Sequence, residues 1–349
     1  MGIEMLPRRH LANLPTPLEE LTRLNEIVKG PKIWIKRDDL TGLAFGGNKL
    51  RKLEYLIGQA LDEGADTIVT SGSIQTNHGR LTAAACARTG LECILVVTEE
   101  DDNIYESNRI LQAFLGSKLA FVDDVKPLEG ETMAKAQLRV GDQKILEVMK
   151  SLQKEGKKPF YIPRGGRSLQ GTASYVNAMG EIKKQVETLN IQIDYIIVAA
   201  ATCSTLTGIL LGARVFDFKT NVIGISVSRD IAEGQQLVVE EFNRDAKALG
   251  YPYQIHTEEV NILGDYLGED YGIPSKESYE AMELLGKTEA IMLDPIYTGK
   301  AMAGLLDLAR KNYFSEQENV LFIHTGGSPL LFLDSVAKRA EELEVKYAT

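Results

Sequence analysis

The chain is organised around one stretch of sequence, TGLAFGGNKLRKLEY at residues 41–55. Alternating apolar residues before it, over 32–37, predict a β-strand, and apolar residues at helical spacing after it predict an α-helix. Lys49 therefore lies at a strand-to-helix junction, behind two glycines that let the backbone approach a ligand closely. Because the start of a helix disfavours a cation, a lysine here indicates a function. The alternative is a solvated lysine that begins an amphipathic helix.

Composition and charge exclude several classes of protein. A chain of 349 residues is long for one hydrophobic core, so we expect two lobes. A net charge of −10 argues against nucleic-acid binding. No apolar run reaches the roughly 18 residues of a membrane span, and no secretory signal pattern is visible. Three cysteines without CxxC spacing suit a reducing compartment, so we expect a cytoplasmic protein. The four histidines lack metal-ligand spacing, and no metal is expected.

Strand-like apolar runs alternate with segments of helical periodicity along the chain. This rhythm predicts an α/β fold with mostly parallel sheets and helices on both faces. Glycine, proline and charge cluster near 46–49 and 154–166, which suggests a small lobe inserted in a larger one, with a ligand between them. The predicted strands are 32–37, 67–71, 93–97, 118–122, 160–163, 195–200, 222–227 and 320–324, and the longer predicted helices include 82–88, 133–153, 175–188 and 233–249.

Five glycine- or hydroxyl-rich turns follow predicted strands, which is where open α/β sheets bind ligands. SGSIQTNH at 71–78 precedes a helix expected to begin near Gly79, and its amides and hydroxyls are suited to a carboxylate; a simple N-cap is the alternative. ATCSTLTG at 201–208 is suited to one phosphate. Three further turns complete the set. The first is the glycine turn within residues 41–55, the second is PRGGRS at 163–168, and the third is HTGGSP at 324–329.

These turns indicate a cofactor. Neither nucleotide fingerprint, GxxxxGK[ST] or GxGxxG after the first strand, is present. A reactive lysine, a cup for a single phosphate and a carboxylate-binding loop together indicate pyridoxal 5′-phosphate acting on an amino acid.

The chain closely resembles the D-cysteine desulfhydrase and 1-aminocyclopropane-1-carboxylate (ACC) deaminase family, from LPTPL at 14–18 to TGG at 325–327. The most specific motifs are KRDD at 36–39, GGNKLRKLE at 46–54, QTNH at 75–78 and LDPIYTGK at 293–300. The resemblance implies a two-lobed fold-type-II pyridoxal phosphate enzyme, similar to the tryptophan synthase β-subunit, and a homodimer. It also implies a large cofactor-binding domain of residues 1–51 and 164–349 and a small inserted α/β domain of residues 52–163.

The resemblance also implies roles for individual residues. Lys49 is the Schiff-base lysine, and Asn77 donates a hydrogen bond to the phenolic oxygen of the cofactor. Thr76 stands at a serine position of the family, whose hydroxyl contacts substrate and shuttles a proton. The implied catalytic residues are Lys49, Thr76, Tyr297 and Tyr271. The implied cofactor-binding residues are Lys49, Asn48, Asn77, Thr202, Cys203, Ser204, Thr205 and Thr325, and the implied substrate-binding residues are Gln75, Thr76, Asn77, His78 and Arg167.

Two positions distinguish the subfamilies. ACC deaminases carry Glu at the position of Thr298 and Leu at the position of Thr325, whereas desulfhydrases are similar to this chain at both. A threonine hydroxyl facing the pyridine nitrogen leaves it largely unprotonated, which makes the ring a weaker electron sink than one paired with a carboxylate. Loss of a good β-leaving group needs less carbanion stabilisation than opening a cyclopropane. We therefore predict β-elimination, most directly of D-cysteine to pyruvate, ammonia and hydrogen sulfide.

Several alternatives remain open at this point. Thr76 replaces the usual serine, Cys203 replaces a common glycine, and Tyr271 has a packing role as its alternative. Arg164 and Arg167 flank a glycine turn where relatives carry small or polar residues. They are either solvated or an anion site for a charged substrate side chain, as in L-cysteate sulfo-lyases. The alternative functions are L-cysteate sulfo-lyase, ACC deaminase and, from another class, a non-catalytic pyridoxal phosphate carrier or amino-acid sensor. The missing GxGxxG disfavours a nicotinamide dehydrogenase.

Overall fold

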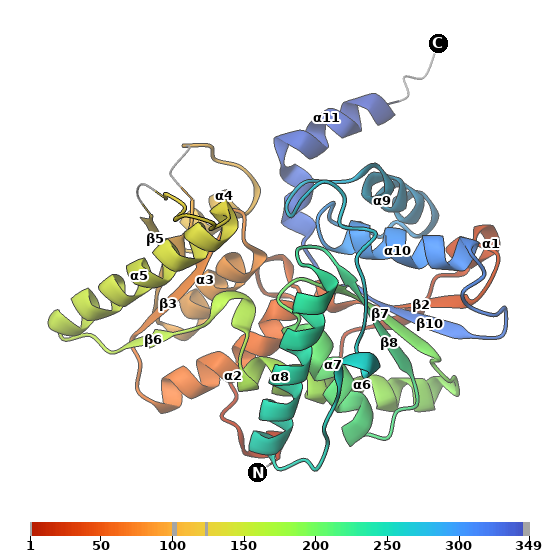
Figure 1. Cartoon of the computed structure of the whole chain (residues 1–349), viewed down its shortest axis with the longest axis horizontal. Helices are drawn as coiled ribbons and strands as arrows, with labels where there is room; N and C mark the ends of the chain where they lie inside the picture. The colour runs from red at the N-terminus through yellow and green to blue at the C-terminus, as the bar shows by residue number, and fades with distance from the viewer. Residues whose placement is uncertain (1, 100–102, 123–124, 345–349) are drawn as a thin grey trace.

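The computed structural model describes residues 2–99, 103–122 and 125–344, which form two lobes, each built on its own sheet (Figure 1). The large sheet has the strand order β1-β2-β10-β7-β8-β9. Its pairings are all parallel except that of the edge strand β1 with β2. Its strands are β1 (Leu18–Glu20), β2 (Lys32–Lys36), β7 (Tyr195–Ala200), β8 (Asn221–Ser226), β9 (Asn261–Leu263) and β10 (Asn319–Ile323).

Helices cover both faces of the large sheet. Successive residues of a strand point to opposite faces, so Leu321 and Ile323 of β10 pack in one core while Val320 and Phe322 pack in the other. The near-continuous apolar runs of the parallel strands are explained by this burial on both sides. One face is covered by α6 (Leu169–Leu189), α7 (Ser204–Val215) and α8 (Ile231–Leu249), and the other by α1 (Thr22–Ile27), α9 (Lys276–Glu289) and α10 (Thr298–Arg310).

The small sheet is fully parallel, with the strand order β5-β4-β3-β6. Its strands are β3 (Thr67–Gly72), β4 (Glu92–Val97), β5 (Lys118–Phe121) and β6 (Pro159–Tyr161). Its helices are α2 (Asn48–Asp62), α3 (Asn77–Thr89), α4 (Ser107–Phe114) and α5 (Met133–Lys154), and the last helix of the chain is α11 (Asp334–Leu343). The division into 1–51 with 164–349 and 52–163 stays a proposal; its boundary at residue 51 falls inside α2.

The α/β fold with mostly parallel sheets is confirmed, and all eight predicted strands are present with ends shifted by at most two residues. Two strands were missed, β1 and β9, because three residues are too few to show alternation. The helix expected near Gly79 begins at Asn77, since the Thr76 hydroxyl caps it by accepting from the Gly79 amide.

Helix α2 connects the lobes, packing on α3 in the small lobe and on α6 in the large lobe. Buried charges fix this position. The Arg51 guanidinium donates to both oxygens of Asp38, at 2.9 and 2.7 Å, and to Glu181 of α6, at 3.0 Å. Asp38 also accepts from the Tyr175 hydroxyl at 2.6 Å. Because a buried charge is costly unless it is fully paired, this network holds α2 in one orientation, and Lys49 lies two residues before Arg51.

Candidate active site

The first turn of α2 meets loops from several parts of the chain. The Lys49 Nζ donates to the Gly165 carbonyl at 3.1 Å. The Asn48 amide donates to the Thr325 carbonyl at 2.9 Å, and the Asn48 side chain donates to the Thr205 hydroxyl at 3.1 Å. The structure therefore brings the predicted lysine, phosphate loop and final glycine turn to one place.

Glycines make this convergence possible. Gly46 and Gly47 have φ of 61° and 128°, which L side chains rarely adopt. A Cβ on Gly46 would lie 2.2 Å from the Asp39 carbonyl oxygen, and a Cβ on Gly326 would lie 2.7 Å from the Gly47 Cα. No other residue allows the two loops to touch in this way.

A second lysine on α2 is buried beside the first. Lys52 is 0% exposed, and its Nζ has no hydrogen-bond partner within the described ranges. Burial lowers the pKa of Lys52 well below its usual value, and the Lys49 ammonium lowers it further. The Lys52 side chain packs on Gly166, at a distance of 3.2 Å from the position of an added Cβ. Sequence reasoning did not single out this residue, although a spacing of three residues places it on the same helix face as Lys49.

The N-terminus of α7 offers a matching donor. The Ser204 hydroxyl is buried there and, within the described chain, also has no partner. Buried polar groups are nearly always hydrogen-bonded, so a lysine amino group and a hydroxyl without partners in the described chain are suited to bind an anion, which would also favour the charged form of the lysine. A helix N-terminus adds amide donors and a favourable dipole for that anion. The residues thus fit a phosphate group, and Lys52 joins the predicted set at 202–205.

Thr202 and Cys203 shape the approach to this N-terminus. A Cβ on Gly165 would lie 2.9 Å from Thr202 Cγ2 and 3.2 Å from Lys49 Nζ, so this glycine lets the two side chains approach each other. Cys203 has a φ of 63°, a left-handed conformation that favours the glycine common at this position. Its thiol is buried and lies near Gly234 of α8. Burial raises the pKa of Cys203 to about 11, so it stays an unreactive thiol.

Asn77 is held in one orientation by two residues that sequence reasoning missed. Its Oδ1 accepts from Asn108 Nδ2 at 2.9 Å and from the Arg80 guanidinium at 3.3 Å. The amide Nδ2 therefore remains to donate toward a ligand oxygen. This orientation is compatible with the predicted bond from Asn77 to a phenolic oxygen. The sequence around Asn77 does not predict Asn108 as its partner, because Asn108 lies on a different helix, α4.

The neighbouring residues of the loop have different environments. The Gln75 side chain holds the start of α4, accepting from the Asn108 amide at 3.0 Å. Because Thr76 caps α3 with an oxygen lone pair, its hydroxyl proton is left to donate. His78 is buried, with Nε2 2.9 Å from the Thr70 hydroxyl, and burial keeps its pKa well below the usual value. The substrate-binding roles of Gln75 and His78 stay predictions.

The two predicted tyrosines lie together. The hydroxyl oxygens of Tyr271 and Tyr297 are 2.5 Å apart, and burial raises the pKa of both phenols. Both phenols are therefore neutral at physiological pH, and one hydroxyl donates its proton in a hydrogen bond to the oxygen of the other. The Tyr297 amide donates to Asp294 at 2.7 Å, which fixes the loop before α10. Such a pair can donate a proton to a leaving group.

Thr298 and Thr325, the two positions that distinguish the subfamilies, differ in whether the hydroxyl is hydrogen-bonded within the protein. Thr298 donates to Asp294 Oδ2 at 2.6 Å and accepts from the Asp294 amide at 2.8 Å. Its hydroxyl is thus fully engaged inside the fold. The Thr325 carbonyl binds the Asn48 amide, and the described chain provides no hydrogen bond to the Thr325 hydroxyl. Of the two, Thr325 is the one that can serve a ligand.

Arg167 has a carboxylate partner. Its Nε donates to Glu241 of α8, whose side chain is 1% exposed. This ion pair attaches the 163–168 turn to α8. A carboxylate partner is one way for two nearby arginines to avoid repulsion. The substrate-binding role of Arg167 stays a prediction.

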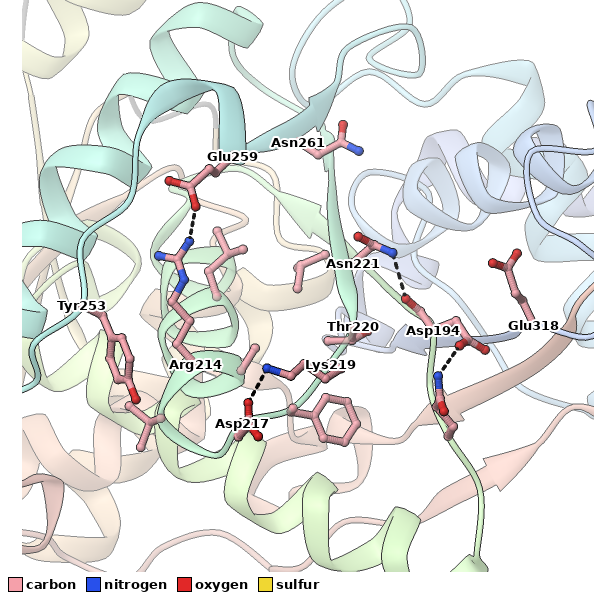
Figure 2. Close-up of a pocket in the computed structure, with 16 residues that line it drawn as sticks. Asp194, Arg214, Asp217, Lys219, Thr220, Asn221, Tyr253, Glu259, Asn261 and Glu318 are labelled. Carbon is pink, nitrogen blue, oxygen red and sulfur yellow. Dashed lines mark hydrogen bonds and ion pairs between the residues drawn. The ribbon is translucent and has the colours of Figure 1, made fainter.

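A separate hollow of about 810 Å³ lies at the opposite edge of the large sheet (Figure 2). Asn221 and Asn261 begin β8 and β9, so this is the amino edge, whereas ligands of open α/β sheets bind at the carboxyl ends. Its charged side chains also pair with one another, as the Arg214–Glu259 contact of 2.6 Å and the Lys219–Asp217 contact of 2.5 Å show (Figure 2). We therefore place the active site around Lys49.

Comparison with known families identifies the family of the chain. A family model described as "Pyridoxal-phosphate dependent enzyme" matches residues 10–326. The chain belongs to this family. The pyridoxal-phosphate-dependent enzyme is 38% identical over 331 residues to proteins named D-cysteine desulfhydrase from Salmonella newport and Salmonella heidelberg, covering 93% of this chain and 95% of each relative. It is also similar to a crystal structure titled as an ACC deaminase homologue, with a TM-score of 0.86, 35% identity and 98% of both chains covered.

The residues described above fit the cofactor of this family. Lys49 would hold its aldehyde covalently, and the N-terminus of α7 with Lys52 and Ser204 would hold its phosphate. Asn77 would donate to its phenolic oxygen, and Thr325 would face its ring nitrogen. When bound, pyridoxal phosphate supplies an electron sink for the α-carbon of an amino acid.

We expect cofactor attachment to follow the titration of Lys49. Burial lowers the pKa of Lys49 to about 8, and only the neutral amine attacks an aldehyde. The rate of covalent attachment to the apoenzyme should therefore rise with pH and level off above about 8. The check is stopped-flow absorbance after mixing with pyridoxal phosphate from pH 6 to 10. A rate that keeps rising to pH 10 would mean that the lysine has its ordinary pKa.

Proposed function

We propose that this enzyme is a carbon–sulfur lyase that catalyses α,β-elimination from a small β-substituted amino acid. Its most direct substrate is D-cysteine, which gives pyruvate, ammonia and hydrogen sulfide. The observation that carries the proposal is the engagement of the Thr298 hydroxyl by Asp294, together with the Thr325 hydroxyl that is left for a ligand. A hydroxyl at the ring nitrogen suits loss of a good leaving group. The similarity to D-cysteine desulfhydrases over 93% of the chain supports the same reaction.

Each catalytic role is carried by a group with a suitable protonation state. The Lys49 amine, made less basic by burial, accepts the α-proton, with the Thr76 hydroxyl as the alternative acceptor. The neutral phenol of Tyr297, hydrogen-bonded to Tyr271, donates a proton to the departing thiolate. The start of α3 offers its amides to the substrate α-carboxylate. Water then releases ammonia, and pyruvate remains.

A substrate panel tests this proposal. The enzyme, loaded with pyridoxal phosphate, is given D-cysteine, L-cysteine, L-cysteate or ACC, and keto acids are identified by chromatography. We expect pyruvate from D-cysteine as the largest signal. Pyruvate mainly from cysteate would favour L-cysteate sulfo-lyase, and 2-oxobutyrate from ACC would favour ACC deaminase, which the structural relative suggests as an alternative. No keto acid from any substrate, despite a bound cofactor, would indicate a carrier or sensor.

Two further expectations belong with this proposal. We infer a homodimer and a cytoplasmic location from the resemblance and from the sequence. Over residues 2–99, 103–122 and 125–344, no helix is long and apolar enough to cross a membrane. Size-exclusion chromatography with light scattering tests the dimer.

A further inference from the structure

Arg80 brings a positive charge into the interior beside the active site. It is the fourth residue of α3, and it is 0% exposed. Burial lowers the pKa of Arg80 to about 9, and among the described residues no neighbouring charge offsets this effect. The guanidinium is still charged at physiological pH. Because both burial and a helix N-terminus disfavour a cation, the position of this charge is unfavourable for the fold alone.

The guanidinium fixes the orientation of two side-chain amides. Its Nη1 donates to Asn108 Oδ1 at 3.1 Å and to Asn77 Oδ1 at 3.3 Å. A guanidinium only donates hydrogen bonds, so both amide oxygens must face it. Asn108 Nδ2 then donates to the same Asn77 oxygen at 2.9 Å. The Asn77 Nδ2 is left on the other side of its amide, and it is the group that would donate to the phenolic oxygen of pyridoxal phosphate.

Arg80 also holds the loop that precedes the reactive lysine. Its Nη2 donates to the Gly46 carbonyl at 2.7 Å, and the same nitrogen lies 3.9 Å from the position of a Cβ on Gly47. In pyridoxal phosphate the aldehyde and the phenolic oxygen are attached to adjacent ring carbons. One guanidinium therefore connects the loop of Lys49, which would hold the aldehyde, with Asn77, which would bind the neighbouring oxygen.

The hydrogen bonds of Arg80 do not by themselves account for its charge. Its three acceptors, the Gly46 carbonyl and the amide oxygens of Asn77 and Asn108, are all neutral. An anion nearby would offset part of the cost of burying the cation. The deprotonated phenolic oxygen of the cofactor would be such an anion, separated from Arg80 by the Asn77 amide. That amide would present its oxygen to the cation and its N–H to the anion, so that both charges polarise it.

We propose that Arg80 is a positioning residue that stabilises the anionic form of the cofactor's phenolic oxygen, acting through Asn77. It also fixes the position of Asn77 relative to the Lys49 loop. Thr325, which would face the ring nitrogen, is neutral, so a cation on the side of the phenolic oxygen supplies favourable electrostatics for negative charge on the ring. The inference concerns the cofactor and does not depend on which amino acid the enzyme uses.

The first test is a titration of the visible absorbance of the cofactor-loaded enzyme from pH 5 to 9. A nearby cation favours loss of a proton from the bound cofactor, so Arg80→Met should raise the midpoint by about one pH unit, the lower end of the effect of a neighbouring charge. Arg80→Lys keeps the charge and should show little of this shift. Lys219→Met is the control, because Lys219 is paired with Asp217 on the surface and its loss changes the net charge equally. Its midpoint should match that of the parent.

A second variant keeps the test valid if Arg80→Met fails to fold. Asn108→Asp leaves Arg80 in place and puts a carboxylate where Arg80 Nη1 now donates to an amide oxygen at 3.1 Å. The cation then has an ion-pair partner, so the midpoint should rise here too. A midpoint that moves in neither variant would overturn the inference.

Cofactor affinity gives a readout that needs no titration in this pH range. Equilibrium dialysis of each apoenzyme measures the Kd of pyridoxal phosphate and of its 3-deoxy analogue, which lacks the phenolic oxygen. The preference of the parent for pyridoxal phosphate should fall about tenfold in Arg80→Met, the factor that corresponds to one pKa unit, and should be largely kept in Arg80→Lys. Equal losses for both compounds would overturn the inference, since Arg80 would then only hold the loops together. Neither measurement uses an amino acid, so both stay decisive if the proposed elimination fails.

Discussion

Replacing Lys49 with alanine should abolish turnover of every amino acid and remove the visible absorbance of the covalently held cofactor. Loss of a general acid or base alone typically lowers a rate by about 10²–10⁴-fold, and this change also removes the covalent anchor, so the loss should be at least that large. The fold should persist, because within the described residues the Lys49 side chain makes one hydrogen bond, to the Gly165 carbonyl.

Three measurements check this result: steady-state rates, absorbance after mixing with pyridoxal phosphate, and thermal unfolding. Arg51→Lys is a useful comparison, because it disturbs the charge network that orients α2 while leaving the amine in place. It should lower the unfolding temperature with the covalent cofactor still attached. A Lys49→Ala enzyme that keeps near-normal elimination would show that the reactive amine lies elsewhere.

Replacing Lys52 with methionine should have opposite effects on the apoenzyme and on cofactor binding. The buried Nζ has no partner within the described chain, and an unsatisfied buried polar group costs about 1–3 kcal/mol. Methionine removes that cost, so the apoenzyme should become more stable. The phosphate loses a charge-assisted bond of roughly 1.5–3 kcal/mol, so the dissociation constant of pyridoxal phosphate should rise about 10- to 150-fold.

Lys300→Met is the matched control. Lys300 is equally buried, but its Nζ donates to the carbonyl oxygens of Leu267, at 2.5 Å, and Asp270, at 3.2 Å. Its loss leaves those acceptors unsatisfied, so this variant should be less stable. Denaturant unfolding of the apoenzymes and equilibrium dialysis with the cofactor measure both quantities. A destabilised Lys52→Met apoenzyme with unchanged cofactor affinity would contradict a phosphate-binding role.

The sequence predicted those parts of the molecule that depend on local pattern. Parallel strands appear as apolar runs, and Lys49 is marked by the glycines before it and the helical spacing after it. The partners of these groups were harder to predict because they come from distant parts of the chain. Asn108 on α4 orients Asn77, and Glu241 on α8 pairs with Arg167. Neither contact can be predicted from the residues near it in the sequence.

For Thr298 and Thr325, the sequence also did not predict which hydroxyl is already hydrogen-bonded within the protein. Sequence comparison placed Thr298 and Thr325 together as markers of reaction type. In the structure the two differ, because the Thr298 hydroxyl is hydrogen-bonded to the carboxylate and the amide of Asp294. The two arginines at 164 and 167 are separated in a similar way, since one has a carboxylate partner and the other has none within the described residues. Residue type alone does not reveal which polar group is already satisfied.

The proposed reaction is elimination of a β-substituent from an amino acid held at Lys49. The most direct test is to incubate the cofactor-loaded enzyme with D-cysteine and to quantify sulfide, ammonia and pyruvate in the same sample. We expect equal amounts of the three products, formed at the same rate, and none with Lys49→Ala. Ammonia and a keto acid without sulfide would contradict β-elimination, and so would consumption of D-cysteine without any pyruvate.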